Sequence, residues 1–143
     1  MQTFLPHPSF FDSARCLDRA RLGKQRIEAR QLITALRQGG GWANHPAARM
    51  WCGYTDALGA YYDVVITEWV LRGYRNTMPY FYDAGDGFSF AQHSLDQGQI
   101  PLPPWLGDPA FHASHRSNLL RKDPVHYGQF GWAEPADLPY VWP

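Results

Sequence analysis

Cysteine is scarce in this chain, and nothing in its placement suggests a metal site or a disulfide framework. The 143 residues include two cysteines, Cys16 and Cys52, whose separation fits no metal-binding motif and allows one disulfide at most. Long apolar runs are also missing, and the opening MQTFLPHPSFFDSAR has no basic leader followed by an apolar stretch. The sequence therefore predicts reduced thiols in a cytoplasmic protein and gives no sign of membrane insertion or export.

Charge is sparse as well, at 18% of residues, and the 13 basic residues balance the 13 acidic ones. The balance hides a division along the chain. Residues 1–50 carry eight Lys or Arg and three acids, a net charge of +5, whereas residues 51–111 carry two and seven, a net charge of −5. This division predicts a basic face suited to a polyanionic ligand, although a dipolar solvated surface would give the same counts.

The length and the hydrophobic content of 45% suit one compact domain, and we expect residues 1–143 to form it. Helix-boundary signals are frequent: Asp, Ser or Asn caps, prolines suited to a first turn, and glycines after basic last turns. They predict three main helices, over about residues 12–37, 46–72 and 109–122. The second carries an apolar stripe, most simply core, of Tyr54, Leu58, Tyr61, Val65 and Trp69. The predicted fold class is all-α.

A long stretch between the second and third expected helices has no helical or strand period. Residues 78–107, MPYFYDAGDGFSFAQHSLDQGQIPLPPWLG, are rich in Gly, Pro and aromatics, and we expect one irregular loop. Its aromatic residues either stack on bases or, as is more common, anchor the loop to the core. They are Tyr80, Phe81, Tyr82, Phe88 and Phe90.

One face of the first expected helix combines polar and apolar residues. At about 100° per residue, this face holds Asp18, Arg21, Gln25, Glu28, Leu32 and Leu36. The leucines predict that the face points inward, so its polar residues need partners within the domain. Two interpretations stay open: a functional pocket around Glu28, or an internal ion-pair network that joins Arg21 to Asp18 or Glu28.

A second face of the same helix is rich in arginine. We call this set the arginine stripe: Arg15, Arg19, Arg26, Arg30 and Arg37. Guanidinium groups match phosphate oxygens, so the stripe is suited to follow a nucleic acid backbone. Arginines placed only for solubility would show the same spacing.

The third expected helix carries histidines at helical spacing. His112, His115 and Lys122 share one face with a leucine, and Arg116 lies on another. Two histidines can approach one metal ion, but a zinc site needs a third ligand and no H-E-x-x-H pattern is present. The sequence therefore favours histidines that face an anion or position a carboxylate, with His45 before the second helix as a further member.

The motifs of the chain resemble a known family in their order and spacing. They are RLGKQRIEA at 21–29, NHP at 44–46, EWVLRGY at 68–74, HRS at 115–117 and LLRKDPVHY at 119–127. Over about four-fifths of the chain, this series resembles the phage-type pyrimidine dimer DNA glycosylase (endonuclease V) family and its bacterial relatives. The resemblance implies a compact all-helical repair enzyme that uses no metal and no organic cofactor.

The resemblance also implies a mechanism. An amine attacks the deoxyribose C1′, the base leaves, and the resulting Schiff base allows β-elimination of the strand. It assigns the essential carboxylate to Glu28 and phosphate binding to Arg21 and Arg26. The other residues expected to bind substrate are Gln25, His45, Arg49, His112, His115, Arg116, Lys122 and Tyr127.

The identity of the amine stays open in the sequence. The family's usual nucleophile is the α-amine exposed when the initiator methionine is removed, but Gln2 is too large to allow that removal. The amine is then that of Met1 or of Lys24, which lies one helical turn before Glu28 and could instead contact phosphate.

The leading hypothesis is a DNA repair glycosylase with AP lyase activity that acts as a monomer on duplex DNA carrying a lesion. Two alternatives remain. One is an enzyme for a free nucleotide or another small anion, since the net charge is zero. The other is a non-catalytic nucleic-acid-binding module, in which the arginine stripe binds and nothing reacts.

Overall fold

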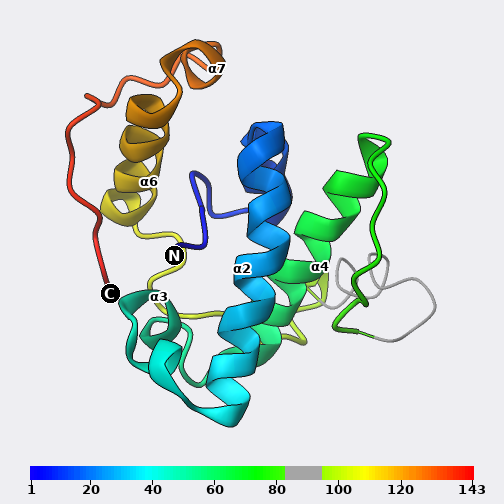
Figure 1. Cartoon of the computed structure of the whole chain (residues 1–143). Helices are drawn as coiled ribbons and strands as arrows, with labels where there is room; N and C mark the ends of the chain where they lie inside the picture. The colour runs from blue at the N-terminus through cyan, green and yellow to red at the C-terminus, as the bar shows by residue number, and fades with distance from the viewer. Residues whose placement is uncertain (83–94) are drawn as a thin grey trace.

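The computed structural model describes residues 1–82 and 95–143, and this part of the chain contains helices and no strand (Figure 1). The helices are α1 (Phe10–Cys16), α2 (Arg19–Gln38), the short 3-10 helix η1 (Gly41–Asn44), α3 (Pro46–Arg49), α4 (Thr55–Leu71), α6 (Pro109–Lys122) and α7 (Pro124–Gly128). The all-α prediction is confirmed. No helix among the described residues has the length and apolar content to cross a membrane.

Helices α2 and α4 lie side by side at the centre of the fold (Figure 1). All residues of α4 from 57 to 67 are buried. Gly23 of α2 permits the close approach, because a Cβ atom there would lie 2.9 Å from the ring of Trp69. The predicted core stripe of α4 is confirmed at its centre, where Leu58, Tyr61 and Val65 are fully buried.

The helix expected over residues 12–37 is two helices, α1 and α2. Helix α1 begins earlier, after Ser9, whose hydroxyl accepts a hydrogen bond from the backbone N–H of Asp12. The chain is extended at Leu17, which is fully buried, and at Asp18, whose backbone N–H donates to the hydroxyl of Tyr127. That hydroxyl donates in turn to the Asp18 carboxylate. The break therefore depends on a residue 109 positions away, which local sequence signals do not report.

The helix expected over residues 46–72 is interrupted at residues 50–54, which separate α3 from α4. Trp51 is fully buried, and its indole N–H donates to the hydroxyl of Thr3 at 3.0 Å. Gly53 then turns the chain with a φ of +84°, a conformation that favours glycine. The residues around the buried Trp51 thus divide the expected helix into α3 and α4. The predicted end of the second helix is confirmed, since Gly73 follows α4 with a φ of +89°.

The third expected helix is confirmed as α6, and the side chain of Asp108 caps its first turn. After α7 the C-terminal tail, residues 129–143, runs back along α6 towards α3 (Figure 1). The backbone N–H groups of Leu138 and Val141 donate to the hydroxyls of Ser117 and Ser114, at 3.0 and 3.1 Å. The hydroxyls of α6 thus fasten the tail to the helix.

Of the loop expected over residues 78–107, the parts 78–82 and 97–107 contain turns and bends but no helix. Tyr80, Phe81 and Tyr82 are partly buried against the core, which favours anchoring over base stacking. The carboxylate of Asp63 accepts hydrogen bonds from the backbone N–H groups of Phe81 and Tyr82, at 2.6 and 3.1 Å. The two remaining aromatics of that prediction lie outside the described residues: Phe88 and Phe90.

Candidate active site

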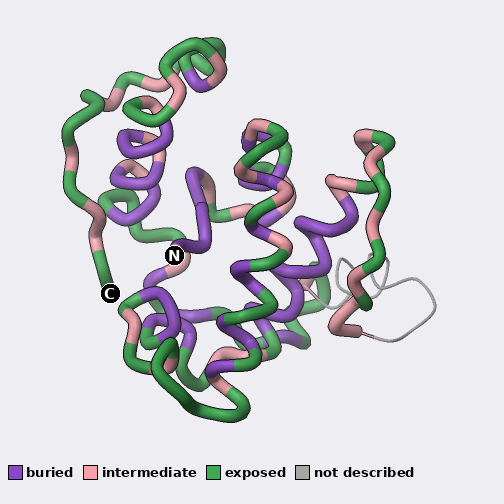
Figure 2. Tube along the Cα trace, in the orientation of Figure 1, coloured by how far each residue is buried: buried purple, intermediate pink, exposed green. Residues whose placement is uncertain are grey.

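The N-terminal arm, residues 1–6, lies between α2 and α6 (Figure 1). Residues 2–6 are buried, and in Figure 2 the start of the tube is purple. The TFLP run at residues 3–6 is mostly apolar, which suits burial. A buried backbone needs hydrogen-bond partners, and side chains of α2, α4 and α6 supply them here.

Two histidines of α6 hold the peptide groups of Leu5. Nδ1 of His115 accepts from the Leu5 backbone N–H at 2.9 Å, and Nδ1 of His112 lies 2.8 Å from the Leu5 carbonyl oxygen. Nε2 of His112 accepts from the backbone N–H of Gly107, so its Nδ1 carries the hydrogen and donates to Leu5. Burial lowers the pKa of both imidazoles, that of His115 to about 3. Both histidines therefore support the arm as neutral rings, away from the anion contact expected of them.

A cavity of about 430 Å³ opens beside the arm. Gln2, Phe4 and Tyr140 line part of it. The rest of its lining includes six residues singled out from the sequence: Met1, Arg21, Lys24, Gln25, Glu28 and Lys122. The cavity thus joins the arm, one face of α2, the end of α6 and the tail, and it favours the functional-pocket interpretation of that face.

The carboxylate of Glu28 is the acid of this lining, and its two oxygens have different neighbours. Oε2 accepts from the backbone N–H of Gln2 and from Nε2 of Gln25, both at 3.3 Å. Oε1 lies 3.5 Å from Nζ of Lys24. The side chain of Glu28 is 12% exposed, whereas that of Lys24 is 73% exposed. The carboxylate is therefore held and nearly buried, while the ammonium is largely solvated.

Arg21 reaches the cavity from an ion pair at the start of α2. Its guanidinium lies 3.2 Å from the carboxylate of Asp18, which also accepts from the Tyr127 hydroxyl. Burial alone would raise the pKa of Asp18, but the hydrogen bonds from Tyr127 and Arg21 lower it below its usual value. Tyr127 is fully buried, so it holds Asp18 rather than facing a ligand. The ion pair between Arg21 and Asp18 is thus confirmed. It occurs together with the pocket around Glu28, so the two interpretations are not exclusive.

The comparisons with known proteins identify the family. A family model described as pyrimidine dimer DNA glycosylase matches residues 1–82, more than half of the chain. The chain belongs to this family. No curated protein and no solved structure matches it. A pyrimidine dimer DNA glycosylase is a DNA repair enzyme, which favours DNA over a small anionic substrate and chemistry over passive binding.

The region matched to the glycosylase family covers the arm and helices α1 to α4. It therefore includes the part of the cavity lining that contains the acid Glu28 and most of the cationic groups. The lining residues in this region include Met1, Arg21, Lys24, Gln25 and Glu28. The remaining lining comes from α6 and the tail. Across residues 1–82 and 95–143, no three His, Cys, Asp or Glu side chains gather closely enough to hold a metal ion.

The arginine stripe of this glycosylase lies largely against aromatic rings. The guanidinium of Arg19 stacks on Tyr74 at 4.8 Å, and that of Arg37 stacks on Phe81 at 4.7 Å. Arg26 stacks on the ring of Trp69 at 4.2 Å. The structure thus places Arg26 away from Glu28 and uses three members of the stripe to join α2 to α4 and the segment after it.

Three other candidate residues also lie outside the cavity lining. Nδ1 of His45 accepts from the backbone N–H of Ala47 and so caps α3. Burial lowers the pKa of His45, the α-amine of Met1 lowers it further and Glu28 raises it, so this ring lies within electrostatic reach of the site. Arg116 pairs with Glu134 and donates to the carbonyl of the arm at residue 6. The third residue, at the end of α3, is the exposed Arg49.

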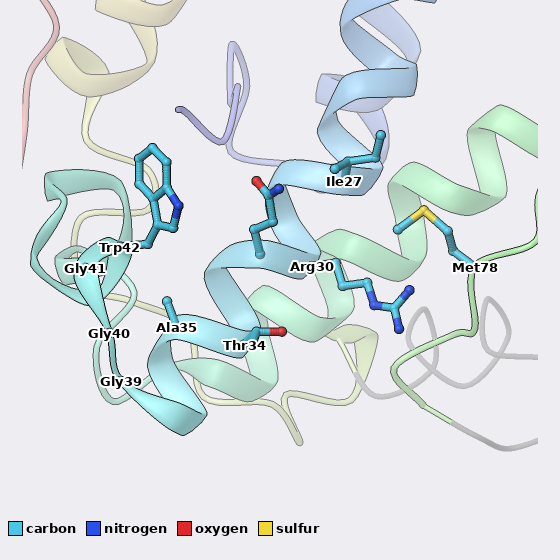
Figure 3. Close-up of a pocket in the computed structure, with 10 residues that line it drawn as sticks. Ile27, Arg30, Thr34, Ala35, Gly39, Gly40, Gly41, Trp42 and Met78 are labelled. Atoms are coloured by element: carbon cyan, nitrogen blue, oxygen red, sulfur yellow. The ribbon is translucent and has the colours of Figure 1, made fainter.

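A larger pocket, of about 590 Å³, lies along the C-terminal half of α2. Figure 3 shows Trp42 on one side of it and Arg30 and Met78 on the other. Its lining includes none of the residues expected to carry the chemistry of the glycosylase.

Sequence reasoning singled out Gln25, His112 and His115 but expected them to contact substrate rather than to hold the arm, and it missed the other residues that hold it. Tyr61 reads as core because of its helical spacing, yet its hydroxyl lies 2.6 Å from Oε1 of Gln25 and 3.0 Å from the carbonyl oxygen of Phe4. Gln2 and Tyr140 of the cavity were missed as well. The signal for the arm was the TFLP run before the first helix, whose apolar composition suits burial.

Proposed function

We propose that this glycosylase releases a damaged pyrimidine with an amine nucleophile and with Glu28 as the acid/base group, and that it then cleaves the abasic strand as an AP lyase. One observation carries the proposal: the buried arm delivers Met1 to the same cavity as Glu28, and the backbone N–H of Gln2 lies 3.3 Å from Glu28 Oε2. A nucleophile beside a positioned carboxylate is the arrangement that this chemistry requires.

In the proposed reaction the neutral amine forms a bond to C1′ of the deoxyribose. The bond from C1′ to the base nitrogen breaks, and its electron pair leaves with the base. Opening of the sugar ring to a Schiff base then places a proton on O4′ and removes one from the amine nitrogen, and Glu28 relays these protons. Loss of a C2′ proton next expels the 3′ phosphate and cleaves the strand.

The geometry favours the α-amine of Met1 over Lys24 as the nucleophile. Met1 is partly buried and continues a segment whose next five residues are buried. Lys24 is 73% exposed, and its ammonium is paired with Oε1 of Glu28. We assign Lys24 to phosphate binding, together with Arg21 and Lys122 on the rim of the cavity.

We also propose that the enzyme acts as a monomer on duplex DNA with a lesion. The arm, Glu28 and the cations of the proposed site meet in one cavity. Sedimentation of the protein with and without DNA at micromolar concentration tests the stoichiometry, and we expect one protein molecule per lesion.

Borohydride trapping on abasic duplex DNA tests the chemistry. We expect a covalent adduct, and peptide mapping should find it on the α-amine of Met1. An adduct on Lys24 would instead make Lys24 the nucleophile in place of the α-amine of Met1. No adduct, with DNA binding and fold intact, would remove the amine mechanism and leave base release by a water molecule that Glu28 activates.

A further inference from the structure

We propose that Gln25 is a positioning residue that couples the placement of the N-terminal arm to that of the Glu28 carboxylate. The proposal rests on the proposed function, since it concerns how the amine and the acid are brought to one geometry. Gln25 borders the cavity but is 1% exposed, and its amide bonds to the arm, to Tyr61 and to Glu28 rather than reaching out to a DNA backbone. This differs from the DNA contact expected of it from the sequence.

The oxygen and the nitrogen of the Gln25 side-chain amide each form two hydrogen bonds. Oε1 accepts from the backbone N–H of Phe4 at 3.0 Å and from the hydroxyl of Tyr61 at 2.6 Å. Nε2 donates to the carbonyl oxygen of Gln2 at 2.8 Å and to Oε2 of Glu28 at 3.3 Å. One side chain thus contacts the arm at two positions, the core helix α4 and the candidate acid.

The orientation of this amide is determined by its neighbours. Burial raises the pKa of Tyr61 well above its usual value, so the hydroxyl stays protonated and can donate. The Phe4 N–H is a donor as well. An amide turned the other way would direct its NH₂ group at the Phe4 N–H, which can only donate, and its oxygen at the Gln2 carbonyl and the Glu28 carboxylate, which accept, leaving buried polar groups unpaired. The NH₂ group must therefore face Gln2 and Glu28.

Two consequences follow for the site. The bonds to Gln2 and Phe4 bracket Thr3, so they fix the path along which the arm reaches Met1. Oε2 of Glu28 already accepts two hydrogen bonds, so Oε1, which faces the solvated ammonium of Lys24 at 3.5 Å, is the oxygen that takes and returns a proton. A displacement of about 1 Å between reacting groups can cost about 100-fold in rate, so loss of this link should slow chemistry rather than binding.

The test compares Gln25→Met with Gln31→Met, a matched change at an exposed glutamine of the same helix. At saturating lesion DNA, we expect Gln25→Met to release base about 10- to 100-fold more slowly in a single turnover, with a Kd within about threefold of the wild type. Gln31→Met should match the wild type in both. Gln25→Asn, which keeps the amide but is one methylene shorter, should show the same loss and serves if the Met variant does not fold.

Amide exchange measured by NMR separates positioning from general destabilisation. In the Gln25 variants we expect the Phe4 N–H to lose protection at least about tenfold more than the Leu5 N–H, which His115 still holds. Equal loss at both amides, or base release that falls only with the folded fraction, would overturn the proposal. A missing borohydride adduct in the wild type would instead refute the amine mechanism, because neither base release nor exchange depends on trapping.

Discussion

At the scale of single residues, the two oxygens of Glu28 differ in a way that bears on catalysis. Oε2 faces two hydrogen-bond donors, whereas Oε1 faces the solvated ammonium of Lys24. A carboxylate held in this way keeps one orientation while a proton moves on and off its other oxygen.

Glu28→Gln tests that assignment. The amide keeps the size of the side chain but cannot exchange a proton, so we expect base release to fall about 100- to 10,000-fold in a single turnover. The Kd for lesion DNA should change by less than about threefold. Glu68→Gln, which breaks an ion pair with Arg72 on α4, is the matched control and should retain activity. Activity of Glu28→Gln close to that of the wild type would exclude Glu28 from the mechanism.

His115 gives a prediction for stability against pH. Burial lowers its folded-state pKa to about 3, whereas an imidazole in the unfolded chain titrates near about 6.5. Between these values the unfolded chain binds more protons, so the free energy of unfolding falls as the pH falls, by up to about 1.4 kcal/mol per pH unit. Urea unfolding at pH 7.5, 6 and 5 should therefore show a shallower dependence for His115→Gln than for the wild type.

Other groups also titrate in this range, among them His112 and Asp63. His112 acts in the same direction as His115, because burial lowers its pKa too. Asp63 acts in the opposite direction at about pH 4–6, because burial raises its pKa to about 6. Both are present in the wild type and in His115→Gln, so Asp63 cancels in the difference, while His112, whose charge also lowers the pKa of His115, cancels except for that coupling. Parallel stability curves for the two proteins would contradict the neutral state of His115.

At the scale of helices, the contact between α2 and α4 depends on an absent side chain. A Cβ at Gly23 would lie 2.9 Å from the ring of Trp69, and the indole N–H of Trp69 is tied to the carbonyl of Arg75 at 2.9 Å. We expect Gly23→Ala to lower the free energy of unfolding by about 1–3 kcal/mol despite the better helix propensity of alanine. Gly128→Ala in α7, where a Cβ meets open space, is the control and should change stability by less than about 1 kcal/mol.

The arginine stripe and the rim of the cavity should respond differently to salt. Arg26 stacks on Trp69 and donates to Asn76 at 2.9 Å, so Arg26→Ala should cost about 1–3 kcal/mol of stability and leave the salt dependence of DNA binding unchanged. Lys122→Ala should leave stability nearly unchanged and reduce the slope of log K against log salt by about 0.9. The reverse pattern would assign phosphate binding to the stripe.

At the scale of the whole molecule, the sequence predicted what local chemistry determines. The cap at Asp108 and the glycine end after α4 at Gly73 were predictable because each depends on residues within one turn. The break at Asp18 was not, because it depends on Tyr127 at the other end of the chain. The break before α4 depends on burial of Trp51, which competes with helix continuation only in the folded state.

The residues of the candidate site can also be separated into those whose place local spacing predicted and those whose role depends on distant partners. Helical spacing alone placed Arg21, Gln25 and Glu28 on one inward face, and the cavity contains all three. Spacing could not show that the Gln25 amide forms its hydrogen bonds with the arm and with Tyr61 rather than with a ligand. Tyr61 lies 36 residues away on another helix. Nor could spacing show that Arg26 lies on the ring of Trp69, since a guanidinium over an aromatic ring leaves the same pattern as one over a phosphate.

The buried arm also restricts how the protein can be built into larger ones. A peptide fused ahead of Met1 has to leave through the 430 Å³ cavity, because the next five residues are buried. The C-terminal end at Pro143 is exposed. We expect an affinity tag at the N-terminus to abolish base release while circular dichroism stays unchanged, and the same tag at the C-terminus to be tolerated. The two ends of this enzyme are therefore not equivalent as sites of fusion, and only the C-terminus is free to carry one.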